Sequence, residues 1–346
     1  MTASAMKLGL LLPNQGVVFG ATTVAELLTM AETAEASGLF DAVFVGDNLL
    51  AKPRLESVTT LSALAARTSK VRLGTACMAS FPLRNPIVLA AQWAALDNIS
   101  EGRALLVVCI GGGGARSGGD GGKNSGNGGS QLVGGFDAEY EAFKIPPSER
   151  AARLEENIAV LRVLWRDDPA SFSGKFHAFE GIAVRPQPVQ KPAPPIWIAN
   201  NPHIFAAKPH IVKRTVERVG RLADGWMTIQ ATPEEFSTSW RAIRDSAAAH
   251  GRDPEAMESS LYFNLNIGED REKAFAETKR FLDQYYSADF TREQIDKWSA
   301  YGPAEVCIEP MLAYAAAGLG TFCVRFAAYD QTGQLKRFIE QVAPLL

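Results

Sequence analysis

Two histidines and one arginine stand where side chains could take part in catalysis. His203 and His210 follow the apolar segment "PIWIAN", and an imidazole titrates near neutral pH, so it can act as an acid or a base. Arg325 lies within the apolar segment "TFCVRF", where a guanidinium needs a phosphate, a carboxylate or an internal ion pair as its partner. His203 and Arg325 are therefore candidate catalytic residues, with a structural role as the alternative for each.

Short polar residues close two of the apolar segments. Asp47 and Asn48 follow "AVFVG", and Asn200 and Asn201 follow "PIWIA". The carboxyl end of a parallel strand is where active sites form, so these side chains could contact a ligand there. The alternative is that they cap the following turns.

Cysteine and histidine spacing does not predict a metal site. There is no C-x-x-C pair, and no H-x-x-x-H with nearby carboxylates, so neither a zinc knuckle nor a dithiol redox motif is expected. Free thiols fit a reducing compartment, and we expect a cytoplasmic protein. Two of the cysteines lie in apolar segments and are expected to be buried. The four are Cys77, Cys109, Cys307 and Cys323.

A glycine-rich stretch, residues 109–136, holds 13 of the 30 glycines. No glycine in it begins a G-x-G-x-x-G pattern, and the residues before Lys123 do not form a P-loop. We therefore interpret residues 112–135 as a flexible surface insertion. A lid over a bound ligand is the alternative.

Composition bounds the classes of function. The 346 residues are 47% hydrophobic and 21% charged, with a net charge of −3, which is typical of a globular protein. Lysine and arginine are scattered singly, so nucleic acid is not an expected partner. The N-terminal apolar run spans only residues 8–12, too short for a signal or a membrane span.

The elements that must position these residues follow a regular order. Short apolar segments alternate with amphipathic ones, which is typical of βα units. A capping box at Thr23 and Glu26 and a terminal Gly38 mark the first helix. Eight such units predict a single-domain (β/α)8 TIM barrel over residues 1–346, with a doubly wound open sheet as the alternative. The predicted strands are 7–12, 42–47, 71–78, 104–111, 195–200, 225–229, 260–267 and 321–326.

Two segments are additional to the eight βα units of a minimal barrel. The first is the Gly-rich insertion after strand four. The second, residues 168–195, alternates apolar and polar residues and then becomes proline-rich, which predicts a hairpin and an extended arm before strand five.

Several phrases together resemble the bacterial luciferase-like monooxygenase superfamily. The resemblance implies a (β/α)8 barrel that binds a reduced flavin, either FMN or the deazaflavin F420, at the carboxyl ends of the strands. The phrases are "GLFDAVFVGDNLL" (38–50), "SKVRLGTACMASFPLRNPIVLAAQWAALDNISEGR" (69–103), "ERAARLEENIAVLRVLW" (149–165), "SGKFHAFEGIAVRPQPVQKPAPPIWIAN" (173–200), "RLADGW" (221–226) and "GPAEVCIEPMLAYAAAGLGTFCVRF" (302–326).

The resemblance also implies roles for particular residues. Strand three of the family often has a non-prolyl cis peptide that supports the flavin ring. Asn48 stands where the family often has histidine, which weakens a proton-transfer role there. The expected cofactor contacts are Asp47, Ala76, Cys77, Met78, Asn85 (in "RNP", where the family has "RHP"), Gly111 (the one glycine kept of the family's "GVGxG"), Asn200 and Asn201; the candidate catalytic residues are Asn48, His203 and Arg325.

The predicted function is a flavin-dependent oxidoreductase. The main prediction is a monooxygenase that uses reduced FMN and O2 on a small organic substrate. No dinucleotide fingerprint occurs in the chain, so a separate flavin reductase is an expected partner. One alternative is an F420-dependent dehydrogenase or reductase, and another is a non-catalytic flavin-binding barrel. The resemblance also suggests a homodimer.

Overall fold

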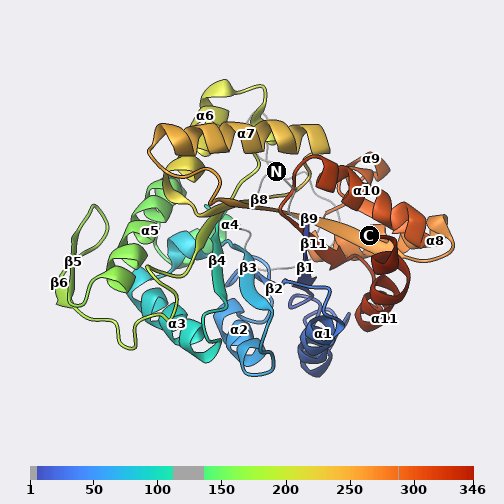
Figure 1. Cartoon of the computed structure of the whole chain (residues 1–346), viewed down its shortest axis with the longest axis horizontal. Coiled ribbons are helices and arrows are strands. Elements are labelled where there is room, and N and C mark those ends of the chain that lie inside the picture. Colours follow the sequence, from blue (N-terminus) through green and yellow to red (C-terminus); the bar gives the residue numbers. More distant parts are fainter. Residues whose placement is uncertain (1–5, 112–135, 287) are drawn as a thin grey trace.

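Parallel strands form the closed barrel at the centre of the molecule (Figure 1). The computed structural model describes residues 6–111, 136–286 and 288–346. Each barrel strand pairs with the next one around the ring, and the last pairs with the first, which confirms the predicted (β/α)8 barrel. The ring consists of β1 (Lys7–Leu12), β2 (Ala42–Asp47), β3 (Arg72–Met78), β4 (Ala104–Val108), β7 (Ile196–Ala199), β8 (Gly225–Thr228), β9 (Glu258–Ile267) and β11 (Thr321–Phe326).

Helices surround the strands (Figure 1). The first has the predicted capping box of Thr23 and Glu26 and ends at Gly38 in the left-handed conformation. Most of the large apolar side chains lie between the helices and the strands, in one buried cluster. The helices are α1 (Val24–Ser37), α2 (Ser57–Ala65), α3 (Pro86–Ile99), α4 (Phe136–Ala142), α5 (Arg150–Arg166), α6 (Pro209–Leu222), α7 (Pro233–Ala249), α8 (Arg271–Tyr286), α9 (Arg292–Asp296), α10 (Ala304–Ala316) and α11 (Gln331–Arg337).

A second, smaller cluster fills the inside of the barrel. The ring of Phe44 fills the space beside Gly9 and Gly74, because a Cβ at either glycine would lie 2.8 Å from that ring. Strand side chains alternate between the two faces. Arg325, two residues after the interior Cys323, therefore also faces inward, one layer nearer the carboxyl end of the barrel. The cluster is Leu11, Ala42, Phe44, Leu105, Val107, Trp197, Met227 and Cys323.

A ninth strand of this sheet, β10 (Ser299–Gly302), was missed by the sequence analysis. The first part of β9 pairs with β8, and its last residues, Asn264 to Ile267, pair with β10 instead. At four residues, "SAYG" is too short to show a period of its own. The short helices α4 and α9 were missed for the same reason.

The predicted hairpin before strand five is confirmed. Strands β5 (Ala170–Ser173) and β6 (Ala178–Ile182) pair antiparallel, and Figure 1 shows them outside the ring of helices. The prediction of a flexible insertion at residues 112–135 lies outside the described residues. Within the described ranges, no helix is long and apolar enough to cross a membrane.

Candidate active site

A bulge at the end of β3 marks the carboxyl face of the barrel. The peptide bond between Ala76 and Cys77 is cis, as the resemblance implied. The pairing of β3 with β4 shifts between Gly74 and Met78. Ala76 and Cys77 are half-buried and pack against the interior cluster, whereas Met78 is fully buried on the helix side. A flat ligand can therefore reach Ala76 and Cys77 but not the side chain of Met78.

The thiol of Cys77 is not activated. The neighbouring Cys109 thiol and burial both raise the pKa of Cys77 well above its ordinary value. A protonated thiol is a poor nucleophile. Cys77 is thus suited to contact a ligand rather than to attack it.

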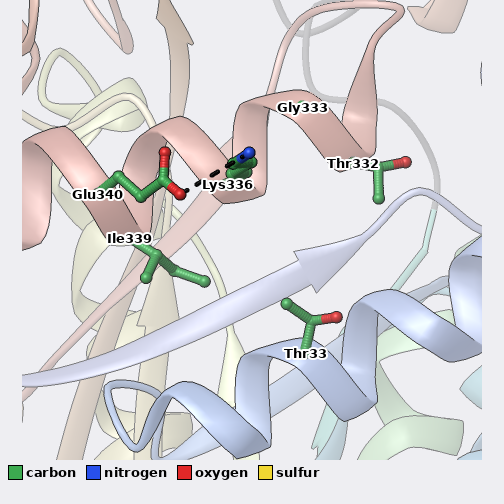
Figure 2. Close-up of a pocket in the computed structure, with 6 residues that line it drawn as sticks. All are labelled: Thr33, Thr332, Gly333, Lys336, Ile339 and Glu340. Atoms are coloured by element: carbon green, nitrogen blue, oxygen red, sulfur yellow. Dashed lines mark ion pairs between the residues drawn. The ribbon is translucent and has the colours of Figure 1, made fainter.

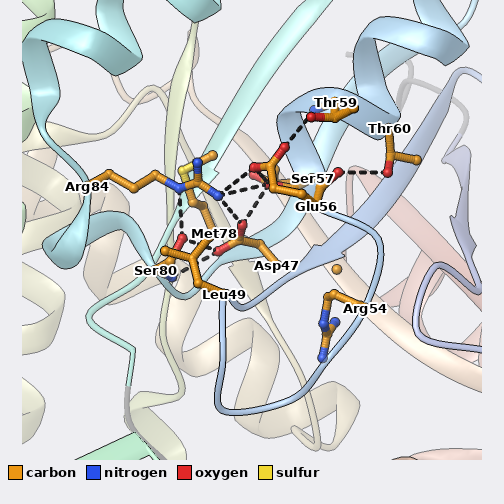
Figure 3. A network of polar contacts seen from close by, with 12 residues as sticks. Asp47, Leu49, Arg54, Glu56, Ser57, Thr59, Thr60, Met78, Ser80 and Arg84 are labelled. Carbon is orange, nitrogen blue, oxygen red and sulfur yellow. Dashed lines mark hydrogen bonds and ion pairs between the residues drawn. The ribbon is translucent and has the colours of Figure 1, made fainter. Parts of the chain in front are cut away.

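Asp47 is the centre of a polar network next to this bulge (Figure 3). Its carboxylate accepts hydrogen bonds from the Ser57 hydroxyl (2.6 Å), and from the Ser80 backbone amide (2.9 Å) and hydroxyl (2.6 Å). Arg84 pairs with Asp47 at 2.8 Å and with Glu56 at 2.8 Å. The network ties the ends of β2 and β3 to the start of α2. Asp47 therefore has a structural role here, and its contact with a cofactor stays a prediction.

Asn48 follows directly and is also buried, with 6% of its surface exposed. Its Nδ2 has no hydrogen-bond partner among the described residues. A buried amide donor without a partner is unfavourable unless a ligand accepts from it. Asn48 is therefore able to hold a carbonyl or another acceptor of a bound molecule.

The other predicted asparagines are engaged by the protein itself. Asn85 caps α3, accepting from the amides of Ile87 and Val88. Asn200 donates from Nδ2 to a backbone carbonyl of α6 and accepts from a tryptophan indole, and Asn201 accepts from the hydroxyl and the amide of two neighbouring residues of the β8 end. The capping alternative is not found at Asn201, whose side chain makes no capping hydrogen bond to the turn that follows it. Cofactor contact at the three positions stays a prediction.

Gly111 has a conformation that requires glycine. Its φ is +60°, and a Cβ would lie 2.3 Å from the carbonyl oxygen of Ala79. The Tyr140 hydroxyl donates to the carbonyl of Ile110 next to it. Close packing of β4's end against the residues after β3 therefore explains this glycine.

His203 lies in the short helical turn Pro202–Phe205 that follows β7. Both ring nitrogens are buried without a hydrogen-bond partner in the described part of the chain. Burial lowers the pKa of His203, so the ring is neutral near pH 7 and can accept a proton. His210 lies at the exposed start of α6. Strands β8 and β9 separate β7 from β11, so the structure does not pair His203 with Arg325.

Arg325 is buried at the inner face of β11, with 3% exposed. It donates from Nε to Asn264 Oδ1 (2.7 Å) and from Nη1 to the Tyr286 hydroxyl (2.8 Å). The internal ion pair considered as the alternative is not found, because no described carboxylate pairs with Arg325. Aromatic rings surround its guanidinium instead.

A surface hollow lies elsewhere, between α1 and the C-terminal helical segment (Figure 2). None of the predicted site residues lines it. Its only charged pair, Lys336 and Glu340, is a loose contact of 3.9 Å. The lining residues are Thr33, Thr332, Gly333, Lys336, Ile339 and Glu340.

Comparison with known proteins decides the family. The sequence pattern described as "Luciferase-like monooxygenase" matches residues 6–319. The chain belongs to this family. It is 25% identical to an F420-dependent glucose-6-phosphate dehydrogenase of Mycobacterium tuberculosis (strain CDC 1551 / Oshkosh), over 93% of this chain and 94% of that protein. The corresponding protein of Amycolatopsis mediterranei (strain U-32) is 27% identical over the same shares.

Solved structures show the same fold. The monooxygenase RslO1 from Streptomyces bottropensis has a TM-score of 0.77 at 23% identity, covering 98% of this chain and 99% of that one. An F420-dependent secondary alcohol dehydrogenase has a TM-score of 0.74 at 18% identity, covering 99% and 100%. The luciferase-like chain described here is thus an oxidoreductase, of a family whose members use F420 or FMN.

Sequence reasoning missed several residues at the mouth of this luciferase-like barrel. Lys52 and Arg54 lie in the segment after β2, and Tyr262, Tyr286 and Trp298 surround Arg325. The signal for the first two was their place just beyond a strand's carboxyl end, where ligands bind. The aromatic residues carried no such signal, since β10, which follows Trp298, was not recognised.

Proposed function

We propose that this protein is an F420-dependent oxidoreductase that transfers a hydride to or from a small organic substrate. The sequence similarity to F420-dependent glucose-6-phosphate dehydrogenases, over 93% of the chain, carries this proposal. It was the alternative in the sequence analysis, and the main prediction, an FMN-dependent monooxygenase, is not confirmed.

The residues at the end of β3 suit a deazaflavin ring. Ala76 and Cys77 present small, half-buried side chains over the apolar barrel interior, which fits a flat ring system packed on one face. Asn48 offers a buried Nδ2 donor that lacks a described partner, and carbonyl oxygens of such a ring are suitable acceptors. When bound, F420 supplies a hydride acceptor or donor.

The chain's own residues position the reactants. Asp47 fixes the bulge through Ser80, so that Ala76 and Cys77 keep one arrangement. Oxidation of an alcohol also releases a proton, and an amide at position 48 cannot take it up. His203, whose neutral ring can accept a proton, is our candidate base.

The test is an anaerobic titration of the purified protein with F420 and, in parallel, with reduced FMN. We expect tight and selective F420 binding, followed by F420 reduction when a suitable alcohol is added. Selective binding of reduced FMN, with oxygenated product after O2 is admitted, would favour the monooxygenase. Binding without any turnover would favour a non-catalytic barrel, and binding of neither cofactor would overturn the proposal.

A further inference from the structure

One nitrogen of the Arg325 guanidinium has no hydrogen-bond partner among the described residues. Nε and Nη1 donate to Asn264 and Tyr286, but the buried Nη2 has no partner among the described residues. Buried guanidinium donors are normally satisfied, because leaving one unpaired is unfavourable. This donor is therefore suited to an acceptor that comes from outside the chain.

Aromatic rings hold this guanidinium in place. The centroids of the rings of Tyr285, Tyr286, Tyr262 and Trp298 lie 4.6, 5.2, 5.3 and 5.5 Å from Cζ of Arg325. Such cation–π contacts stabilise a desolvated cation without supplying a negative charge. The charge of Arg325 thus remains available to a ligand.

Two further cations reach the same tyrosines. Lys52 Nζ lies 4.6 Å from the centroid of the Tyr286 ring. Arg54 lies over Tyr285 at 5.8 Å and donates from Nη1 to its hydroxyl at 3.4 Å. In Figure 3 Arg54 lies to one side of the Asp47 network, so it is not part of that ion-pair cluster.

The two arginines of this group have no described carboxylate that hydrogen-bonds to or pairs with them. Burial favours the neutral form of Tyr285, but the charges of Arg54, Arg325 and Lys52 outweigh it and lower the pKa of that tyrosine. The pKa of Lys52 is lowered to about 8, mainly by burial; Tyr285 opposes this shift, and the charges of Arg54 and Arg325 contribute to it. Positive charges held together in a partly dry environment repel one another, and a bound anion would relieve this.

We infer that Lys52, Arg54 and Arg325 form a binding site for an oxyanion, a carboxylate or a phosphate, carried by the substrate. The inference rests on the proposed function, because it makes this anion the part of the substrate that orients it for hydride transfer. Arginine suits such groups because its planar fork matches their oxygens. We name this group of three cations the oxyanion site.

The position of the oxyanion site favours the substrate over the cofactor as the source of the anion. Arg325 is on β11, separated by β1 and β2 from the bulge on β3 that suits the deazaflavin ring, whereas Lys52 and Arg54 follow β2, the strand next to β3. The three cations and the bulge are all near the carboxyl end of the barrel. A substrate anchored at the oxyanion site would therefore approach the ring from the neighbouring wall.

The experiment measures binding of inorganic phosphate and of benzoate to the whole protein by calorimetry, with and without F420. We expect both probes to bind, and Lys52→Met and Arg325→Lys each to weaken binding by about tenfold or more, the loss of one charge-assisted hydrogen bond. Lys213→Met, which removes an exposed lysine on α6, is the matched control and is expected to change nothing. F420 affinity is expected to stay within about twofold of the wild type in all three variants.

The outcomes separate the two proposals. Probe binding that is absent in the wild type, or unchanged in both Lys52→Met and Arg325→Lys, would overturn the oxyanion site. Competition between phosphate and F420 would assign the cations to the cofactor instead and overturn it as well. If F420 does not bind at all, the proposed function fails, whereas the phosphate titration still decides the oxyanion site. Lys52→Met covers the case in which Arg325→Lys does not fold.

Discussion

At the scale of single residues, Asn48 Nδ2 and Arg325 Nη2 are among the buried donors that lack partners within the described residues. Asn48 directly follows β2 and Arg325 lies on β11, so both are near the carboxyl face of the barrel. A folded chain normally satisfies such groups internally. Their positions therefore indicate where bound molecules complete the protein's hydrogen bonds.

Replacing Asn48 by leucine separates cofactor binding from stability. The apoprotein is expected to keep its free energy of unfolding or to gain slightly, because a buried donor without a partner disappears. F420 affinity is expected to fall by about tenfold, equivalent to ~1.4 kcal/mol for one lost hydrogen bond. Urea unfolding of the apoprotein and fluorescence titration with F420 measure the two effects. A destabilised apoprotein with unchanged F420 affinity would contradict the role given to Asn48.

Lys52 makes oxyanion binding dependent on pH. Its pKa in the folded protein is lowered to about 8, so the ammonium is charged below pH 8 and loses its proton above it. Benzoate affinity is therefore expected to be full below pH 8 and to decline as the pH rises through 8. Benzoate is the suitable probe because a carboxylate stays ionised throughout this range.

Calorimetry on either side of pH 8 measures this dependence, and Lys52→Arg is the comparison because its charge persists. The decline is expected to disappear in that variant. An identical decline in the wild type and in Lys52→Arg would show that another group is responsible.

At the scale of elements, the Asp47 network joins two strand ends to a helix start. Asp47→Asn leaves the guanidinium of Arg84, of which the side chain is only 11% exposed, without its buried partner. We expect a loss of about 3 kcal/mol in the free energy of unfolding. Glu56→Gln removes the other carboxylate that pairs with Arg84, and this carboxylate is half-exposed. We expect this change to lower the free energy of unfolding by about 1 kcal/mol. Equal losses in urea unfolding would contradict the central role of Asp47.

The end of β4 depends on close contact at Gly111. Gly111→Ala combines a positive φ with a Cβ that would lie 2.3 Å from Ala79 O, and we expect a loss of about 2–3 kcal/mol. Gly20→Ala is the matched control, since its φ is +76° but nothing lies within 4 Å of the added Cβ, and about 1 kcal/mol is expected there. The difference in urea unfolding measures the contact alone, and no difference would argue against it.

The elements differ in how far the sequence could predict them. The barrel strands were predictable because each is a buried apolar segment bounded by helical periodicity. Strand β10 was not, because its pairing with the far end of β9, rather than its own residues, makes it a strand. Asp47 was recognised as a strand-end carboxylate, but its partners Ser80 and Arg84 lie more than 30 residues away, a distance that no local pattern spans.

The oxyanion site shows the same limit. Arg325 was singled out because a lone charge in an apolar strand stands out in the sequence. Lys52 and Arg54 lie in the mixed segment "NLLAKPRLE" after β2, where only their place beyond a strand's carboxyl end was a signal, and the fold then placed them against Tyr285 and Tyr286. The cis peptide bond between Ala76 and Cys77 was predicted only from the resemblance to the family, because neither residue type indicates a cis bond.

At the scale of the whole molecule, one side chain packs between three strands inside the barrel. Phe44 is fully buried and fills the space left by Gly9 on β1 and Gly74 on β3. Phe44→Ala is expected to lower the free energy of unfolding by about 3–5 kcal/mol, because the cavity cannot collapse within a closed ring. Phe143→Ala, at a half-exposed position, is expected to cost less than about 1 kcal/mol. Urea unfolding checks both, and a small loss for Phe44→Ala would mean that the barrel contracts.

Strand β10 also marks the end of a segment whose amino acids could be substituted without changing the barrel. The stretch from residue 288 to Trp298 precedes β10, whose backbone pairs with β9. The ring of eight strands closes without it. Substitutions in this stretch, in evolution or by design, could therefore change the residues that surround Arg325 while the eight barrel strands and the β3 bulge keep their structure.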